Sequence, residues 1–343
     1  MKNERIIIGD CPVCGAKISY TFHKKTGIYA CLACGYKTNE FTSQLMSGGY
    51  KQLRVNNVFR KNSEELRIYY LNAEAQAYYQ FILSRNETAL NYLKKRGFTE
   101  GDIKTFGFGY ADGSLYQYLK NKGYSFEDMK LAGLVIDNEI DYFRHRITIP
   151  IKDMTGRILG FGARTITDAT PKYLNTKETL VFQKRKVLFG IDRINYNAGH
   201  IIICEGYMDA ITLQKHGFNA IAGMGTALTE NQATIIGSFN KEIRCMYDSD
   251  DAGKVATLKN METLQRYEIP CKWVDLSPYK DPDEFLKHET VDELRKRMEK
   301  ALPRGLMLIQ MYKNTPEYMH DFCKIVSTLN EEHLKNIKKL RDH

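Results

Sequence analysis

The sequence predicts a multi-domain α/β protein. Its 343 residues are enough for two or three domains. Between residues 199 and 290, short apolar runs rich in β-branched residues alternate with helical stretches, which is the pattern of a parallel sheet. Near the N-terminus, two Cys-x-x-Cys pairs indicate a small metal-bound module that precedes this part of the chain.

Composition narrows the class of protein. No apolar stretch approaches the roughly 20 residues that span a bilayer, and the N-terminus lacks a signal-peptide core. We therefore expect a cytoplasmic protein with no membrane partner. In such a reducing compartment Cys204, Cys245 and Cys271, which lie in or beside apolar runs, are expected to be small core residues rather than disulfides.

The net charge of +9 is unevenly distributed along the chain. Lys and Arg are in excess between residues 142 and 190, whereas Asp and Glu are in excess between residues 200 and 289. A basic region favours phosphate-bearing partners, and an acidic region favours divalent cations. Two ordinary solvated surfaces would give the same balance, so charge alone leaves both interpretations open.

Residues 1–41 are predicted to form a zinc ribbon. Four thiolates at this spacing can surround one structural Zn²⁺, whereas a redox dithiol would need only one pair. His23 is then a surface residue, and the residues around Lys24 and Lys25 are expected to form a hairpin turn. Aromatic residues and lysines alternate here and favour contact with single-stranded nucleic acid, although the aromatics could instead pack the ribbon core. The zinc ligands are Cys11, Cys14, Cys31 and Cys34.

Residues 42–62 are polar, contain Gly48-Gly49 and are predicted to be a linker. Residues 63–198 are predicted to form a mixed α+β basic subdomain. It begins with helices, and ITIPIKD, TGR and ILGFGAR then indicate a hairpin in which Gly160 and Gly162 allow a close approach of the backbone. Short strands and loops that present cations could line a groove for nucleotide phosphates. The side chains considered are Arg144, Arg146, Arg164, Lys172, Asn175, Lys184, Arg185 and Lys186.

Residues 199–290 are predicted to form a parallel α/β subdomain. HIIICE, FNAIAGMG, EIRCMYDSD and PCKWVDL are expected strands. Helices are expected after each of the first three, one of them with Thr229 as its N-cap. Residues 291–343 are predicted to be a C-terminal helical segment. In it Leu306, Leu308, Ile309 and Met311 pack back on the core, and residues 331–343 are solvated.

Carboxylates follow the strands of this subdomain. Ligands of open parallel sheets bind at the carboxyl ends of the strands. Carboxylates that converge there would repel one another without divalent cations, and their hard oxygens suit two or more Mg²⁺ or Mn²⁺ ions. Glycines near them would let phosphates approach the backbone. The alternative is that some of these acids, such as Asp209 and Asp251, only cap helices. The predicted cluster is Glu205, Asp248, Asp250, Asp281 and Asp283.

These motifs resemble those of the bacterial DnaG-type DNA primases, and the chain resembles a phage-encoded version of them. EGYMDAITLQKHGFNAIAGMGTALTENQ, YDSDDAGKVA and DPDEFL are similar to the three motifs of the TOPRIM fold. FRHRITIPIKDMTGRILGFGAR and PKYLNTKETLVFQK are similar to the basic-ridge motifs of that family's polymerase core. The resemblance implies synthesis of short RNA primers from ribonucleoside triphosphates on single-stranded DNA, with an RNA–DNA hybrid as product.

The resemblance also implies roles for individual residues. Glu205, Asp248 and Asp250 would be the principal catalytic metal ligands, with Asp209, Asp281 and Asp283 nearby. The phosphate contacts would be Arg146, Arg164, Lys172 and Lys184, and Asn175 belongs to the same motif. Many cellular members use three Cys and one His in the ribbon, whereas this chain has four Cys. The short C-terminal segment leads us to expect that a replicative helicase is met in trans.

Two other functions are compatible with parts of the pattern. A TOPRIM nuclease or topoisomerase-like enzyme would use the same metals to cut DNA, and the 22 tyrosines do not exclude a nucleophilic one. The basic-ridge motifs argue against it. A non-catalytic zinc-ribbon binding protein would not need a cluster of carboxylates at strand ends.

Overall fold

A computed structural model describes four strands within residues 5–38 and the chain from residue 57 to residue 314, except Thr226, with side chains over residues 64–311. The chain divides into two compact units, Met1–Tyr70 and Leu71–His343. Helix α1 (Asn57–Leu83) contains the boundary.

The first unit contains an antiparallel sheet in the order β1-β2-β3-β4. The expected hairpin is present, because His23 pairs with Ile28 across the turn. Cys31 ends β3, but no cysteine side chain of the tetrad belongs to the described residues, so the zinc site stays a prediction. Helix α1 begins at Asn57, inside the stretch expected as linker, because no Gly or Pro interrupts the helix formers that follow. The strands are β1 (Arg5–Gly9), β2 (Tyr20–His23), β3 (Ile28–Cys31) and β4 (Lys37–Thr38).

An antiparallel sheet in the order β10-β9-β8-β5 forms the first part of the second unit. The expected hairpin is confirmed as β8 and β9, which pair around the turn at Gly156. Nearly every residue of both strands is buried, so the sheet is covered on both faces. Its strands are β5 (Gly109–Ala111), β8 (Arg146–Lys152), β9 (Ile158–Thr165) and β10 (Tyr173–Asn175).

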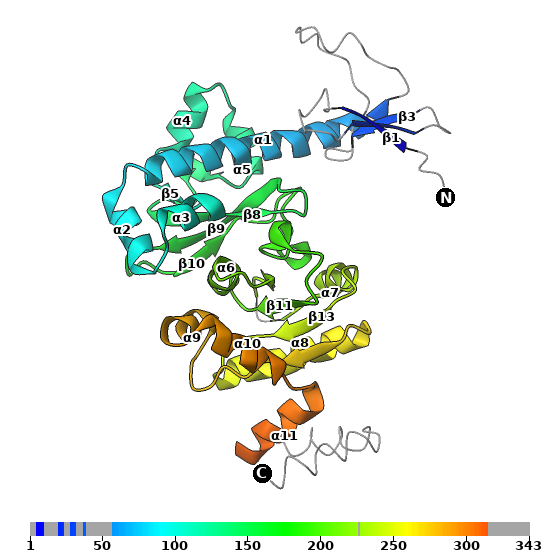
Figure 1. The fold of residues 1–343 in the computed structure, drawn as a ribbon. Coiled ribbons are helices and arrows are strands. Elements are labelled where there is room, and N and C mark those ends of the chain that lie inside the picture. The colour runs from blue at the N-terminus through cyan, green and yellow to red at the C-terminus, as the bar shows by residue number, and fades with distance from the viewer. Residues whose placement is uncertain are drawn as a thin grey trace. The chain divides into compact units, whose positions relative to one another are not determined.

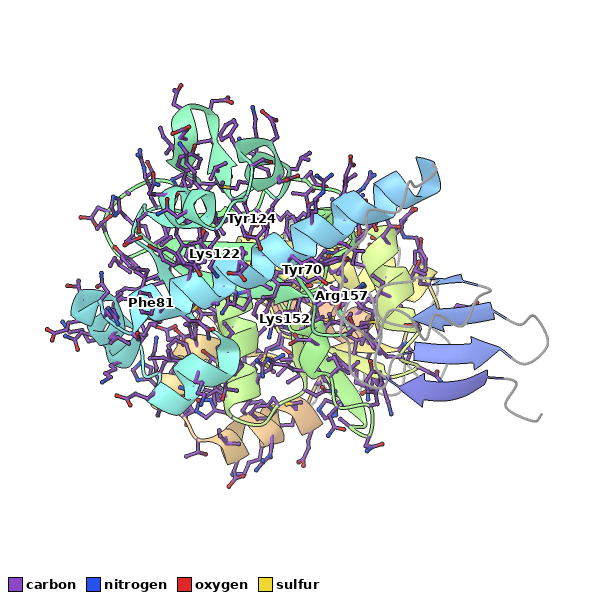
Figure 2. All side chains as sticks on the ribbon, turned by 90° about the horizontal axis from the view of Figure 1, so that it is seen from above. Tyr70, Phe81, Lys122, Tyr124, Lys152 and Arg157 are labelled. Atoms are coloured by element: carbon purple, nitrogen blue, oxygen red, sulfur yellow. The ribbon has the colours of Figure 1, made fainter. Side chains whose placement is uncertain are left out.

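Helix α1 packs along this sheet. The Asn72 amide donates to the carbonyls of Ile158 and Leu159, and the Tyr79 ring meets Phe161 edge to face. Figure 2 shows Lys122 and Tyr124 on one side of α1 and Lys152 and Arg157 on the other. The remaining elements here are α2 (Glu87–Lys95), α3 (Glu100–Phe106), α4 (Leu115–Asn121), α5 (Phe126–Leu131), β6 (Val135–Ile136), η2 (Asp137–Glu139) and β7 (Ile140–Asp141).

The second sheet is parallel, as the alternating pattern predicts, with the order β12-β11-β13-β14. The central strand β11 is the run HIIIC, and its three isoleucines are fully buried. Thr229 caps α7 as predicted, because its hydroxyl accepts from Gln232 N. The elements are β11 (His200–Cys204), α6 (Tyr207–Lys215), β12 (Ala220–Ala222), α7 (Glu230–Gly237), β13 (Glu242–Cys245), α8 (Asp251–Arg266), β14 (Cys271–Trp273) and α9 (Pro282–His288).

Helix α6 lies between the two sheets of this unit (Figure 1). The contact depends on Gly162 of β9, because a Cβ there would lie 2.9 Å from the ring of Tyr207 in α6. The Tyr207 hydroxyl donates to the Ala163 carbonyl at 3.4 Å. The connecting chain adds an antiparallel bridge between Phe189 and Ala222, which ties it to the edge of the parallel sheet. Its short helices are η3 (Lys184–Lys186) and η4 (Ile191–Arg193).

The C-terminal part follows as α10 (Val291–Glu299) and α11 (Arg304–Asn314). Leu308 and Met311 are buried in the core beneath the parallel sheet, as expected, together with Met307. Residues 315–343, including the predicted solvated tail, lie outside the described residues. Among the described helices, none combines the length and the apolar character that a membrane span needs.

Candidate active site

Glu205 lies where the sequence pattern predicts, directly after the buried strand β11. The next strand, β13, is its parallel neighbour, and Met246 beyond β13 still donates to the Ile203 carbonyl at 2.9 Å. Asp248 therefore follows two residues later at the same edge of the sheet. Cys204 is fully buried while Glu205 is partly exposed, so the apolar run anchors the strand and delivers the carboxylate to the surface of a cavity.

Asp250 begins helix α8. Its Oδ1 accepts from Gly253 N at 2.8 Å, so this carboxylate is an N-cap. Its charge acts on Glu205, but Asp250 is not among the residues that line the cavity. A Cβ at Gly253 would lie 2.2 Å from the Asp248 carbonyl oxygen. The glycine therefore lets the first turn of α8 pack against the backbone of Asp248, which is a different role from the phosphate approach expected from the sequence.

The charges at this edge are not balanced. Burial, then the charges of Asp248 and Asp250, raises the pKa of Glu205 above its ordinary value. Burial also raises the pKa of Asp248, against the opposing charge of Lys280. The effect is greatest at Asp209, where burial and the charges of Asp281 and Asp248 raise the pKa to about 8. A divalent cation would remove this repulsion.

The two aspartates of α9 are engaged differently. Asp281 caps the helix and accepts from Glu284 N at 2.7 Å, yet it still lines the cavity. Asp283 already accepts hydrogen bonds from three side chains. Arg96 Nη2 lies 2.8 Å and Lys287 Nζ 2.6 Å from its Oδ2, and the Thr212 hydroxyl donates to Oδ1 at 3.0 Å. Burial disfavours the charge of Asp283, but Lys287 and Arg96 outweigh this and lower its pKa.

The opposite wall of the cavity is basic. Asn175 ends β10, and Lys172 directly precedes that strand. Arg164 comes from β9 and Lys184 from η3. The cavity between the two walls has a volume of about 560 Å³. It is lined by Arg96, Arg164, Lys172, Tyr173, Asn175, Lys184, Glu205, Gly206, Tyr207, Met208, Asp209, Met224, Gly225, Asp248, Lys280, Asp281 and Asp283.

Local contacts hold the basic side chains in place. The backbone of Lys184 is tied to α7, because the amide of the buried Gln232 donates to its carbonyl at 3.4 Å. Arg164 donates to the Tyr173 hydroxyl, and its guanidinium lies 5.0 Å from the centre of that ring. Asn175 Oδ1 is buried and finds no donor among the described residues, so it can accept a hydrogen bond from a ligand.

Arg146 is placed differently from the other predicted phosphate contacts. It is only 7% exposed and does not line the cavity. Its Nη1 donates to the Lys172 carbonyl at 3.3 Å, and burial lowers its pKa. Arg146 therefore holds the backbone of Lys172 in place from the buried side of the sheet.

The donor set at the acidic edge fits Mg²⁺ or Mn²⁺, because it consists of carboxylate oxygens that repel one another. Over residues 64–311, Thr226 apart, no three His, Cys, Asp or Glu side chains are close enough together to hold a metal ion. A cationic side chain stands among them instead, because Lys280 Nζ lies 3.5 Å from Asp248 Oδ2. Glu205, Asp248 and Asp250 interact electrostatically with one another, and Asp209 and Asp281 interact with each other and with Asp248.

Several cavity residues were not identified from the sequence. Tyr207 and Lys280 stand beside predicted acids, in EGYMD and KDPDEF, and their proximity in sequence could have indicated them. Arg96 gives no such signal. It ends a helix far from the acidic motifs, and only the fold brings it to Asp283, 187 positions away.

Comparison with known proteins agrees with this architecture. Residues 77–195 match the model of the DNA primase catalytic core, N-terminal domain, and residues 202–286 match a Toprim-like model. A DNA primase of Clostridium acetobutylicum is 32% identical over 321 residues, covering 86% of this chain and 54% of the relative. One from Staphylococcus aureus is 35% identical over 320 residues, covering 83% and 53%. The chain spans about half the length of these curated relatives.

Solved structures are similar over more of their length. The DnaG primase catalytic domain bound to single-stranded DNA is 31% identical, with a TM-score of 0.66, and the match covers 73% of this chain and 83% of that one. The E. coli primase catalytic core is also 31% identical, with a TM-score of 0.65 and coverage of 76% and 89%. The zinc-binding and RNA polymerase domains of the Aquifex aeolicus primase give 28% identity, a TM-score of 0.70 and coverage of 96% and 87%. Because the chain covers most of the catalytic cores that it matches at this identity, it belongs to the family of DnaG-type DNA primases.

Proposed function

We propose that this protein is a primase that joins ribonucleotides into short RNA primers on a single-stranded DNA template. The observation that carries the proposal is the cavity of about 560 Å³ with carboxylates on one wall and cations on the other. The carboxylates can hold a divalent cation, and the cationic side chains opposite them can hold the phosphates of a nucleoside triphosphate. The reaction class is nucleotidyl transfer, in which a primer 3′-hydroxyl attacks the α-phosphate and pyrophosphate leaves.

Glu205, Asp248 and Asp250 are the proposed principal ligands of two or more Mg²⁺ or Mn²⁺ ions, with Asp209 and Asp281 beside them. Such ions stabilise the charge that develops on the attacking and leaving oxygens. Asp283 is assigned a supporting role, because Arg96, Lys287 and Thr212 already use its oxygens.

On the opposite wall, Arg164, Lys172 and Lys184 are the proposed phosphate contacts. Fixed cations hold the triphosphate and keep its α-phosphate oriented towards the acidic edge. Asn175 offers an acceptor through its unpartnered Oδ1. Arg146 acts indirectly through its hydrogen bond to the Lys172 carbonyl.

The proposal is tested with single-stranded DNA, labelled ribonucleoside triphosphates and Mg²⁺ or Mn²⁺. We expect short RNA products from the wild-type chain, and their loss from Glu205→Gln and Asp250→Asn. Asn is also a good N-cap, so the second variant keeps helix α8 while it removes the charge. Removal of metal-binding charge is expected to lower turnover by at least about a hundredfold.

Asp251→Asn is the matched control. It removes a carboxylate from the neighbouring position, where the side chain is 94% exposed and pairs only loosely with Lys254. This variant should retain wild-type synthesis. Near wild-type turnover of Glu205→Gln or Asp250→Asn would refute the proposed site.

The same assay tests the nuclease alternative. Shortened DNA in place of RNA would indicate a Toprim enzyme that cuts the strand. The primase-core match over residues 77–195, outside the Toprim-like segment, favours synthesis.

The template and partners are proposed from the relatives. One structural relative is bound to single-stranded DNA, and another contains a zinc-binding domain beside its polymerase domain. We assign this chain a single-stranded DNA template, an RNA–DNA hybrid product and a structural Zn²⁺ on Cys11, Cys14, Cys31 and Cys34. A replicative helicase is proposed as a partner, with the cytoplasm as the place of action.

A further inference from the structure

A second cavity, of about 730 Å³, lies at the opposite edge of the parallel sheet. Its lining includes His200, the first residue of β11, and Asn219, which directly precedes β12. These positions mark the amino ends of the strands, whereas the carboxylates of the proposed polymerase site follow the carboxyl ends. The two cavities share no lining residue.

Three arginines from three different elements line this second cavity: Arg193 from η4, Arg244 from β13 and Arg295 from α10. Glu299 is the one carboxylate among its lining residues. Arginines therefore outnumber carboxylates in the lining, although each arginine also has a carboxylate neighbour outside it: Asp192, Glu242 and Asp292. Burial and the charge of Arg244 lower the pKa of His200, which disfavours a positive charge on its imidazole.

Of the three arginines, Arg244 has the least complete hydrogen bonding. Its Nη2 pairs with Glu242 at 2.8 Å, but Glu242 also lies 3.2 Å from Lys272 and so divides its charge between two cations. The Nε and Nη1 atoms of Arg244 are buried and find no acceptor among the described residues. Buried N–H groups without acceptors are costly, so this guanidinium is poised for an anionic oxygen that would complete its hydrogen bonding.

The other two guanidiniums are held over aromatic rings. Arg193 lies 4.9 Å from the centre of the Phe106 ring, and it donates to the Thr105 carbonyl. Arg295 lies 6.0 Å from the centre of the Phe218 ring, and its Nη1 contacts Asp292 at 2.7 Å. Arg193 Nε also lies 3.9 Å from Asp192 Oδ2. Each guanidinium has five N–H donors, so one or two neighbouring acceptors leave several of them available.

We propose that this cavity binds a diphosphate group, either as free pyrophosphate or as part of a nucleotide. Guanidiniums from separate directions match an anion with several charged oxygens better than a single carboxylate, because each can make charge-assisted hydrogen bonds to a different oxygen. The cavity has the volume of a small-molecule site, and Phe218 gives it an aromatic wall for a base. The ligand would contact three elements at once: β13, α10 and η4, which lies in the segment that connects the two sheets.

The test is calorimetric titration of the full-length chain with pyrophosphate and, separately, with GDP, at low salt and without divalent cations or DNA. Arg295→Ala removes a side chain that is 61% exposed, so the fold should be retained. Arg244→Met removes the buried guanidinium. We expect each to weaken binding of the ligand about tenfold. Lys94→Ala is the control and should bind as wild type does, because this exposed cation lines neither of the two cavities.

The two sources of the diphosphate are separated by Phe218→Ala. If the ligand is a nucleotide, this variant lowers the affinity for GDP and leaves the affinity for pyrophosphate unchanged. If the ligand is free pyrophosphate, the wild-type chain binds pyrophosphate more tightly than GDP. No measurable binding of either compound to the wild-type chain overturns the proposal. So does a result in which Lys172→Ala weakens binding while Arg244→Met and Arg295→Ala do not, because the ligand would then occupy the proposed polymerase cavity. Because no RNA synthesis is measured, the outcome does not depend on the proposed polymerase function.

Discussion

Arg96 Nη2 lies 2.8 Å from Asp283 Oδ2, and the two side chains are only 21% and 13% exposed. Arg96 ends helix α2 and Asp283 belongs to the first turn of α9, so this ion pair joins the part of the chain before the antiparallel sheet to the last helix of the acidic edge. Of the two aspartates in the DPD sequence, Asp283 therefore has a structural role in this ion pair. Asp281 lines the cavity and forms no ion pair with Arg96.

Loss of this ion pair should destabilise the fold. We expect Arg96→Met and Asp283→Asn each to lower the free energy of unfolding by about 2 kcal/mol, because each leaves a largely buried partner unsatisfied. Urea denaturation of both variants and of the double variant gives the coupling energy. Lys287→Met is the control. It contacts the same carboxylate but is 49% exposed, and should cost about 0.5 kcal/mol or less. Additive effects of the two substitutions would contradict the pairing.

Lys280 should compete with divalent cations for the acidic edge. Its ammonium lies 3.5 Å from Asp248, and the charge of Asp248 raises its pKa. We expect Lys280→Met to tighten Mn²⁺ binding roughly threefold to tenfold, measured by electron paramagnetic resonance without nucleotide or DNA. The gain should shrink at high salt, because Lys280 is 59% exposed. Lys280→Arg keeps the charge and should behave as wild type, and equal affinities of all three proteins would refute the competition.

Stability of the metal-free protein should depend on Asp209. Its pKa is raised from 3.8 to about 8 in the fold, so the folded state holds this proton more tightly than the unfolded chain does. The free energy of unfolding should therefore fall as pH rises from about 4 to about 8. Melting temperatures between pH 5 and pH 9, measured in EDTA, should show this slope in the wild type and a shallower one in Asp209→Asn. Identical slopes would contradict the assignment.

Lys172 and Arg146 should differ in what their loss affects. Lys172→Ala should raise the nucleotide concentration needed for synthesis and leave stability unchanged, because this side chain lines the cavity. Arg146→Ala should raise the same requirement and also lower the free energy of unfolding by about 2 kcal/mol, since a buried hydrogen bond is lost. Nucleotide titrations paired with thermal melts distinguish the two. Unchanged stability of Arg146→Ala would mean that Arg146 meets the nucleotide directly.

Zinc content tests the N-terminal prediction. Cys31→Ser should lower zinc binding below one ion per chain and reduce template-dependent initiation, because it removes one of four thiolate ligands. Circular dichroism should show the polymerase core unchanged. Metal analysis that finds no zinc in the wild-type protein would refute the ribbon.

The sequence by itself determined the alternation of strands and helices along the parallel subdomain and the carboxylates that follow its strands. β11 could be predicted because a continuous β-branched run buried on both faces has a local signature, and Glu205 interrupts it. The N-cap at Thr229 and the hairpin of β8 and β9 could be predicted for the same reason, since capping and turn chemistry act within a few residues.

Only the tertiary structure decided which of the predicted residues face the cavity. Arg146 and Lys172 look equivalent in sequence, yet one is buried beneath the other, because β8 is covered on both faces of its sheet. Asp281 and Asp283 are two residues apart, but only Asp283 meets Arg96. Local sequence patterns report propensity and periodicity within a segment, whereas a partner 187 residues away is fixed only when the helices and sheets pack against one another.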